Sequence, residues 1–134
     1  MAKISQEIQE FIKGKMGWVS TASLNGIPNS TPKGSVRVLD DEHVVFADLF
    51  SCKTRENLKV NPHVAVTVVD LKTLKGYQLK GSAEMITAGP LFDEMKAQVM
   101  RAPMKMPPLV YAVKITVDSI YDQSVGPDAG KKIA

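Results

Sequence analysis

A regular alternation of side-chain character between residues 111 and 117 sets the strongest limit on how this chain can fold. Tyr, Val, Ile and Val stand at the odd positions, and Ala, Lys and Thr stand at the even positions. A period of two places one face of an extended strand against a core and the other face toward solvent. This segment is therefore predicted to be a β-strand of a half-buried sheet.

Five further segments have strand-like composition, so the chain is predicted to be mainly β. They are rich in β-branched and apolar residues, and turn-forming residues separate them. The six expected strands cover residues 18–24, the return segment 27–39, and then 43–47, 63–69, 77–86 and 111–117. Six antiparallel strands with a few short helices predict a closed or nearly closed barrel.

Length and composition fit one domain over residues 1–134. Hydrophobic residues make up 44% of the chain and charged residues 23%, which is typical of globular proteins. Chains of this length normally form one core, and splitting into domains begins at considerably greater length. No internal repeat or linker suggests a second domain.

The turn after the first strand is the clearest hairpin signal. Asn25 and Gly26 are residues that accept positive φ angles, so a second strand is expected to run back directly after them. Pro28 and Pro32 in this return strand cannot donate ladder hydrogen bonds. The strand is therefore expected to be an edge, or to be bulged or interrupted, around residues 31–34, where something other than a neighbouring strand meets its backbone.

Both ends of the chain carry predictions of their own. Apolar residues recur at helical spacing behind Ser5, which is a good capping residue, so an amphipathic helix is expected within residues 1–14. Residues 126–134 begin with a Gly-Pro pair and are expected to form a loosely held tail.

Two more helices are expected inside the chain. Ser51 or Thr54 can cap a short helix that the pair Asn61-Pro62 stops. Pro90 suits the first position of another helix, whose buried stripe contains apolar residues at positions 91, 95 and 99. The three prolines between residues 102 and 108 predict an irregular connection after it.

Charge and composition exclude several kinds of partner. Seventeen basic and fourteen acidic residues leave a formal net charge of +3, and the lysines are scattered apart from Lys131-Lys132. Nucleic-acid binders usually show a basic stripe with stacking aromatics, whereas aromatic residues make up only 6% here. We therefore expect no nucleic-acid partner, and a small anionic ligand suits the balance better.

A cytoplasmic chain without membrane insertion is expected. The single cysteine, Cys52, excludes an intrachain disulfide, and residues 1–7 lack the apolar core of a secretory signal. The apolar stretch at residues 64–69 is far shorter than the roughly 20 residues that span a bilayer.

His43 and His63 have no partner at metal-ligand spacing, so no metal site is expected.

The segment with the most chemical content follows the third expected strand. Ser51, Lys53 and Thr54 bring two hydroxyls and an ammonium to a helix start. Free N–H groups and the positive end of the helix dipole also lie there, so this segment predicts a phosphate site. The alternative is that the hydroxyls only cap the helix and the lysine is solvated.

At these residues the sequence resembles the pyridoxamine 5′-phosphate oxidase-like, FMN-binding split-barrel family. Four features agree in order over residues 18–69: the strand-turn-strand 19–28, the triplet Ser51-Cys52-Lys53, a short helix through Asn57-Leu58, and Asn61-Pro62 before a Val-rich strand. The resemblance implies a six-stranded antiparallel split β-barrel that binds FMN.

The resemblance also implies a role for each site residue. In that family, residues like Ser51, Lys53 and Thr54 hold the phosphate, and the isoalloxazine ring is bordered by backbone at positions like Thr31, Pro32, Lys33 and Gly34. Ala47 and Asp48 are expected to lie between the two segments. Asp48 is expected either to contact the ribityl hydroxyls or simply to start the turn.

Two departures from the oxidases limit what the resemblance implies. Cys52 stands where the true oxidases have an arginine that grips the phosphate, so phosphate affinity is expected to be lower and Cys52 to act as a small filler. The chain also ends at Ala134 without the segment through which those oxidases bind pyridoxal substrate. Vitamin B6 synthesis is therefore not predicted.

Members of that family place the flavin at the seam of a two-fold dimer, so a homodimer is expected. Trp18 and the loop Met104–Pro108 are candidates to cover the ring. For both, a structural role is the stronger interpretation, because a tryptophan is usually part of the core and a Met-Pro loop usually fills an awkward gap.

The leading hypothesis is an FMN flavoprotein that acts as an oxidoreductase or electron carrier, with no catalytic residue assigned. Lys33 is expected to stabilise the anionic reduced flavin if it lies near the pyrimidine edge of the ring. One alternative keeps the barrel but binds haem or a deazaflavin, and haem would need His43 or His63 as an exposed axial ligand. Another is a cofactor-free dimeric binding protein.

Overall fold

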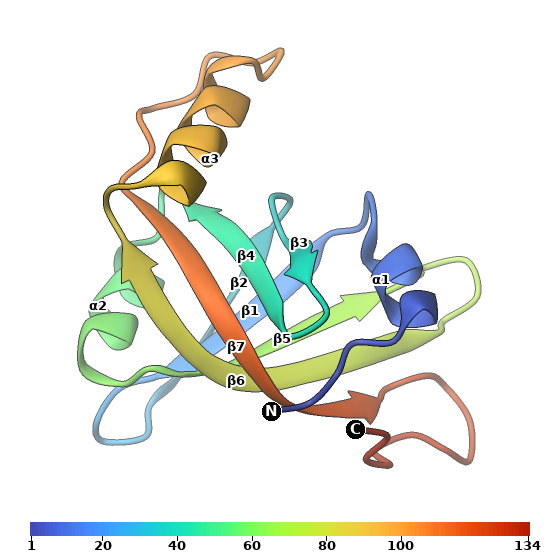
Figure 1. The fold of residues 1–134 in the computed structure, drawn as a ribbon. Helices are drawn as coiled ribbons and strands as arrows, with labels where there is room; N and C mark the ends of the chain where they lie inside the picture. Colours follow the sequence, from blue (N-terminus) through green and yellow to red (C-terminus); the bar gives the residue numbers. More distant parts are fainter.

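The computed structural model describes residues 1–134 and is mainly β, with three short helices around one antiparallel sheet (Figure 1). β-Branched residues favour the strands, and glycine or proline between most of them ends one strand before the next begins. The elements are α1 (Gln6–Ile12), β1 (Gly17–Ala22), β2 (Pro28–Lys33), β3 (Arg37–Asp40), β4 (His43–Asp48), α2 (Cys52–Val60), β5 (His63–Val69), β6 (Gly76–Ile86), α3 (Pro90–Met100) and β7 (Tyr111–Asp122).

The sheet has seven strands, one more than predicted, in the order β2-β1-β5-β6-β7-β4-β3. The extra strand arises because the return segment 27–39 breaks after Lys33. Its first half, β2, pairs with β1, and its second half, β3, pairs with β4 at the opposite edge of the sheet. The predicted interruption is therefore confirmed, and it divides one expected strand between the two edges.

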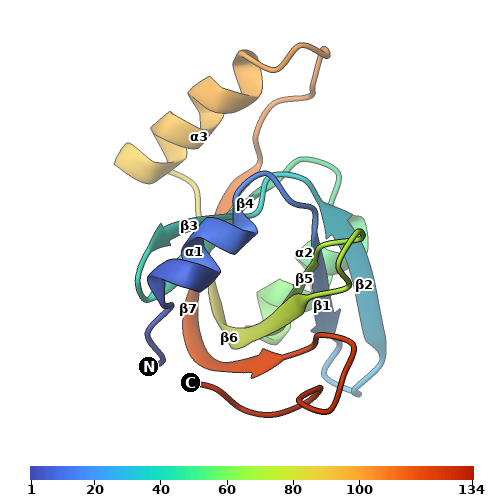
Figure 2. The same cartoon turned by 90° about the vertical axis from the view of Figure 1, so that its right-hand side faces the viewer.

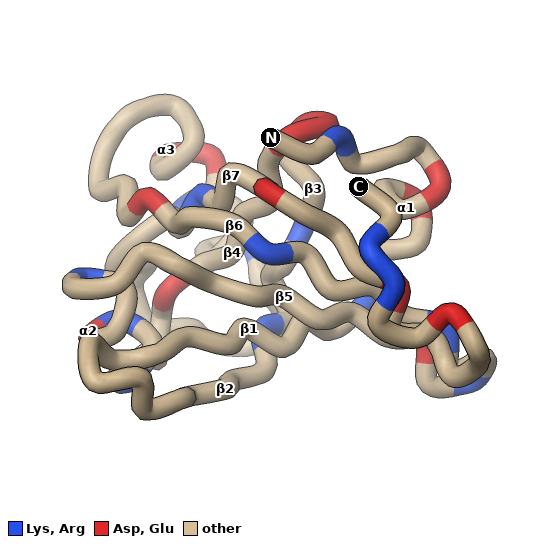
Figure 3. Tube along the Cα trace, turned by 90° about the horizontal axis from the view of Figure 1, so that it is seen from below, with Lys and Arg blue, Asp and Glu red and all other residues tan.

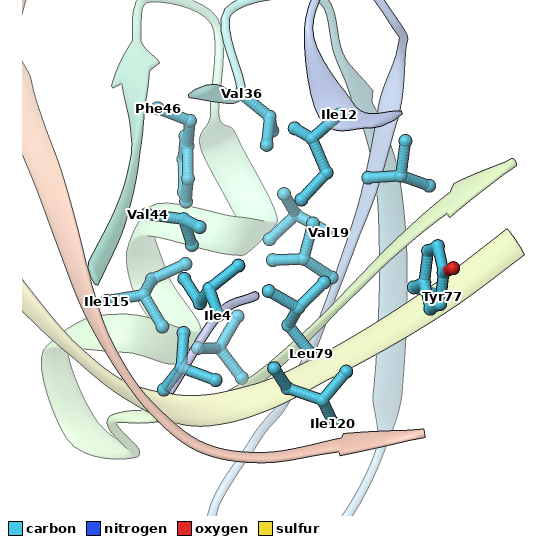
Figure 4. Packing of buried hydrophobic residues seen from close by; sticks show 14 of the residues in the cluster. Ile4, Ile12, Val19, Val36, Val44, Phe46, Tyr77, Leu79, Ile115 and Ile120 are labelled. Atoms are coloured by element: carbon cyan, nitrogen blue, oxygen red, sulfur yellow. The ribbon is translucent and has the colours of Figure 1, made fainter. Parts of the chain in front are cut away.

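The sheet curls around a single main core, as the view along its interior shows (Figure 2). Val44 and Phe46 from β4, Val19 from β1 and Ile115 from β7 point into the same space (Figure 4). All four side chains are essentially inaccessible to solvent. The alternation predicted for residues 111–117 is confirmed, since Val113, Ile115 and Val117 are buried in the main core while Lys114 and Thr116 between them are only half-buried.

Helix α1 closes one opening of the barrel, and its cap is the predicted one. The Ser5 side chain accepts a hydrogen bond from the Ile8 backbone N–H, which satisfies one of the free donors at the helix start. Ile4, Ile8 and Ile12 are buried in the main core. The N-terminal helix therefore contributes core side chains to the barrel.

The hairpin between β1 and β2 forms as predicted, with one correction to its turn. Gly26 has φ +79°, whereas Asn25 does not have a positive φ. The Gly26 N–H donates to the Ser23 carbonyl and the Ser23 N–H donates to the Ile27 carbonyl. This is a longer loop that needs a left-handed residue only at glycine.

Helix α2 packs against the β1–β2 hairpin, on the face of β1 that points to the main core. Asn57 Nδ2 donates to Thr21 Oγ1 at 3.0 Å, and Asn61 Nδ2 donates to the Ala22 carbonyl at 3.2 Å. Leu58 supplies the apolar contact with the main core. These contacts place the second half of α2 beside the end of β1, although β4, not β1, precedes the helix in the chain.

Helix α3 projects from one end of the barrel and lies outside its main core (Figures 1 and 2). Pro90 is its first residue, as predicted. Met95 is buried in a second, smaller cluster with Val45, Ala47 and Ala112. The helix therefore covers the outer face of β4 and β7 near one end of each strand.

The C-terminal tail is not loose, which corrects the expectation for residues 126–134. The Asp122 N–H donates to the Lys131 carbonyl, the Ile133 N–H donates to the Ile120 carbonyl, and the Ile120 N–H donates to the Ala134 carbonyl. Tyr121 and Lys132 also form an isolated antiparallel bridge. The tail thus adds a short strand-like pairing to the end of β7.

No helix is long and apolar enough to cross a membrane. Basic and acidic positions are interspersed along the trace (Figure 3). Three exposed ion pairs join segments that are distant in sequence: Lys3–Glu42, Lys75–Glu7 and Arg37–Glu94. Exposed pairs of this kind each contribute little to stability.

At Gly81, where the register between β6 and β7 shifts, the two strands leave no room for a side chain. Lys80 pairs with Ser119 and Gly81 pairs with Val117, so Asp118 is left over as a bulge. A Cβ atom at Gly81 would overlap the Thr116 carbonyl oxygen. Only glycine allows the two strands to lie this close.

We predict that Gly81→Ala lowers the free energy of unfolding by about 3 kcal/mol, because the added methyl group displaces backbone. Gly34→Ala is the matched control, since the nearest atom to its added Cβ is Met16 Cε at 3.9 Å. The control is expected to change stability by less than about 1 kcal/mol. Urea unfolding checks both values, and equal effects would contradict the close approach.

Candidate functional site

A cleft of about 630 Å³ opens between the end of β2, the end of β4 and helix α3. The predicted ring-bordering residues Thr31, Pro32, Lys33 and Gly34 all line it, and so does Ala47. The segment after β4, helix α3 and the loop after it also contribute to the lining, with Leu49, Phe50, Met95, Gln98, Val99, Ala102 and Met106. The structure therefore brings five of the ten predicted site residues to one cleft of ligand size.

The cleft exists because the sheet is unpaired at this point. β3 pairs with β4 only as far as Val45, so the edge of β4 beyond it lacks a strand partner. The Ala47 N–H donates instead to Ser35 Oγ at 2.9 Å. Where the return strand breaks, β4 therefore has no strand-to-strand hydrogen bonds on this edge. The Ser35 side chain takes one of its N–H groups, and the cleft lies beside the rest.

Lys33 connects the cleft to the start of α2. Its ammonium donates to Ser51 Oγ and lies 5.8 Å from the centre of the Phe46 ring. Burial lowers the pKa of Lys33 below its ordinary value, the Asp48 carboxylate partly opposes this shift, and the Arg55 charge adds to it. Lys33 is thus a half-buried cation whose hydrogen-bond partner is a neutral hydroxyl.

Asp48 starts the turn after β4 and does not face the cleft. Its carboxylate is 1% exposed and accepts the Ser51 N–H at 3.2 Å. Arg55 donates to it twice, from Nε at 2.8 Å and from Nη2 at 3.1 Å. This bidentate pair holds the turn after β4 against the first turn of α2. Of the two roles expected for Asp48, contact with a ribityl chain or starting the turn, the structure has Asp48 start the turn.

The helix-start residues divide into a buried pair and an exposed pair. Ser51 and Thr54 are buried, while Cys52 and Lys53 are exposed. Thr54 Oγ1 accepts a hydrogen bond from Asn29 Nδ2 of β2 at 3.2 Å. The hydroxyls therefore join α2 to β2, and neither of them caps the helix through a side-chain hydrogen bond.

The start of α2 has free donors and an excess of positive charge. The backbone N–H groups of Lys53 and Thr54 have no acceptor within the protein. Lys33, Lys53 and Arg55 lie at or beside this helix start, and Asp48, the carboxylate hydrogen-bonded there, is already neutralised by Arg55. An anion is the ligand that such an arrangement stabilises.

Several residues of this region are missed by the sequence analysis. Arg55 comes directly after Thr54, the last predicted site residue. It is seven residues from Asp48, across a turn and into a helix, so neither a helical nor a strand period predicts this ion pair. Asn29 and Ser35 lie in the Pro-rich return segment, where their polar side chains are the available signal. The α3 residues join the cleft only through tertiary packing.

The remaining candidates are the two histidines considered as haem ligands and the two segments considered as covers for the ring. Neither His43 nor His63 lines it, and His43 Nδ1 lies 2.7 Å from Asp40 Oδ1. Trp18 is 44% exposed on β1, so the interpretation as a core residue is wrong. Met106 of the Met104–Pro108 loop lines the cleft and Met104 is exposed.

The lowered pKa of Lys33 predicts a specific pH dependence of stability. Between this pKa and the ordinary value of 10.5, the unfolded chain binds more protons than the folded one, so the stability of the protein rises with pH. Lys33→Met lacks this contribution. The free energy of unfolding of the wild type relative to Lys33→Met is therefore expected to increase as the pH rises from neutral toward 10.5.

Urea unfolding at several pH values measures this difference. Lys53→Met, which removes an exposed ammonium nearby, is the control for general charge effects. A difference between wild type and Lys33→Met that stays constant with pH, or falls, would refute the burial of the Lys33 charge.

Comparison with known proteins agrees with this architecture. A protein of Methanocaldococcus jannaschii called uncharacterized protein MJ0282 is 36% identical over 138 residues, which cover 100% of this chain and 90% of that protein. The crystal structure of HupZ from Group A Streptococcus superposes with a TM-score of 0.83 at 29% identity, covering 95% of this chain and 99% of the other.

The fold is shared more widely, and one family model accounts for most of the chain. The crystal structure of an FMN-binding protein from Syntrophomonas wolfei subsp. wolfei has a TM-score of 0.77 at 19% identity, covering 90% of this chain and 89% of the other. A family model described as pyridoxamine 5′-phosphate oxidase matches residues 4–124. The chain therefore belongs to the pyridoxamine 5′-phosphate oxidase family and has its split-barrel fold.

Proposed function

We propose that this protein binds FMN, with the phosphate at the start of α2 and the ring in the cleft beside β2. The observation that carries the proposal is Lys33, a half-buried cation that joins the cleft to the start of α2 and has no carboxylate of its own. An anionic ligand at that point would compensate the desolvated charge. The name of the Syntrophomonas protein supports a flavin in this fold.

The donor set fits a phosphate. Two free backbone N–H groups, at Lys53 and Thr54, belong to a nine-residue helix, and the Lys53 ammonium is exposed next to them. Two hydroxyls, at Ser51 and Thr54, lie behind this edge and already have partners in β2. Lys53 and the backbone are therefore the direct phosphate donors in this proposal, and the hydroxyls position the helix.

The cleft fits a planar ring with polar edges. Its β2 side offers backbone at residues 31–34 that no neighbouring strand pairs on the cleft side. Its other side is largely apolar. When bound, FMN supplies electron or hydride transfer, and the protein contributes position, electrostatics and exclusion of water. Lys33 is the cation placed to favour added negative charge in the cleft, so an oxidoreductase or electron carrier is the activity we propose.

We further propose that the protein is a homodimer whose second copy covers the cleft. Trp18 exposes a large aromatic surface on β1, and its register partners are Pro32 on β2 and Thr67 on β5. Pro32 also lines the cleft. A partner seated on Trp18 would therefore reach the edge of the cleft, as partners do in the family.

The first experiment is an absorption spectrum of the purified protein, followed by mass spectrometry of the released chromophore. The proposal expects paired flavin maxima and the mass of FMN. A Soret band would indicate haem, and a deazaflavin would be identified by its mass. Colourless protein that does not bind added FMN would support a cofactor-free binding protein and contradict the proposal.

We predict that Lys53→Ala weakens FMN binding about tenfold and leaves riboflavin binding nearly unchanged, because only FMN carries the phosphate. Flavin fluorescence quenching measures both affinities. Lys59→Ala removes an exposed lysine at the other end of α2 and serves as the control. Equal loss for FMN and riboflavin would place the phosphate elsewhere.

The proposed dimer is tested by sedimentation equilibrium. Trp18→Glu buries a charge in the proposed interface and is expected to shift the protein to monomer. Leu71→Glu, at an exposed loop position on the β5–β6 connection, is the control and is expected to leave the dimer intact. A monomeric wild type, or a dimer that persists in Trp18→Glu, would contradict this interface.

A further inference from the structure

The proposed hydrogen-bonding contacts of the flavin ring lie on the β2 side of the cleft, and none of them is on the α3 side. Its lining is mostly apolar, with Met95 and Val99 from α3, Met106 from the loop after it, and Leu49 and Phe50 from the segment after β4, and Gln98 is the polar exception on α3. Methionine side chains adapt to the shape of a bound molecule. This side of the cleft therefore suits an apolar body next to the ring.

One charged side chain interrupts these apolar walls. Arg37 of β3 lines the cleft, and its guanidinium crosses to α3, where Nη2 donates to Glu94 Oε1 at 2.7 Å. The Arg37 Nε is buried and has no hydrogen-bond partner. Arg37 is thus only partly satisfied, since a guanidinium edge normally pairs with both oxygens of a carboxylate.

Glu94 is a weakly held partner for this arginine. Its side chain is 54% exposed and contributes a single oxygen, and the Gln98 amide shares the same oxygen at 3.4 Å. Glu94 can therefore turn into solvent at little cost, because exposed ion pairs are weak. A ligand carboxylate that used both oxygens would satisfy the arginine better.

We infer that the substrate is an apolar molecule with a carboxylate, and that Arg37 binds this carboxylate in exchange for Glu94. The inference rests on the proposed function for the position of the flavin beside the substrate. The carboxylate is favoured over other anions because Glu94 already holds the same group at the same edge of the guanidinium. Arg37 is then the residue that selects carboxylic acids over neutral analogues.

The test uses 2-naphthoate and its neutral analogue 2-naphthamide as probes, with affinity measured by isothermal titration calorimetry. Each probe is titrated into the protein without flavin and again after saturation with FMN. The wild type is expected to prefer the acid by about tenfold. Arg37→Gln is expected to lose that preference, and Glu94→Gln is expected to tighten naphthoate binding several-fold because the competing carboxylate is gone.

Arg101→Gln is the matched control, since Arg101 is an exposed arginine at the end of α3 that does not line the cleft. It is expected to bind both probes like the wild type. Equal affinity for acid and amide, retention of the preference in Arg37→Gln, or absence of naphthoate binding in both the wild type and Glu94→Gln would overturn the inference.

The two proposals fail in different ways. If the protein binds no FMN but shows the naphthoate preference with these variants, the flavin assignment is wrong and the carboxylate site stands. If FMN binds and the preference is absent, the flavin assignment stands and the carboxylate site is wrong.

Discussion

Three residues, 34–36, hold the two edges of the sheet together. β2 and β3 are the outermost strands, yet the chain passes from one to the other in four residue steps, from Lys33 to Arg37. Such a segment spans at most about 14 Å. The sheet must therefore curl until its edges nearly meet, and the barrel is closed by a covalent connection in place of a hydrogen-bonded ladder.

This connection also creates the cleft. Because the two edges do not pair directly, backbone near Gly34 and Ala47 is left beside an opening, and Ser35 supplies a side-chain acceptor for one of the freed N–H groups. The same break brings Lys33 next to the helix that follows β4. The fold thus places a half-buried cation, free helix-start donors and an apolar wall around one space.

Local sequence signals were sufficient for most of the fold. The alternation in β7, the capping residue Ser5 and the prolines of the return strand each act through neighbours in the chain, and each prediction was confirmed. The position of β3 was not predictable in this way, because it depends on which edge the second half of the return strand joins. The docking of residues 126–134 on β7 likewise depends on backbone pairing that composition does not reveal.

The candidate site was predictable in part. Residues 31–34 and Ala47 do line one cleft, and the hydroxyl-lysine-hydroxyl segment does begin a helix beside it. Whether those hydroxyls point outward could not be predicted, since their burial against β2 depends on how α2 packs. Arg55 and Arg37 acquire their importance only from contacts made across the fold.

The most direct test of the central claim is a comparison of backbone amide shifts in ¹⁵N-labelled protein titrated with FMN and with riboflavin. The account predicts that shifts caused by FMN and not by riboflavin concentrate at residues 51–55, where the phosphate is proposed to bind. Differences located elsewhere, or the same shifts with both flavins, would show that the start of α2 is not the phosphate site.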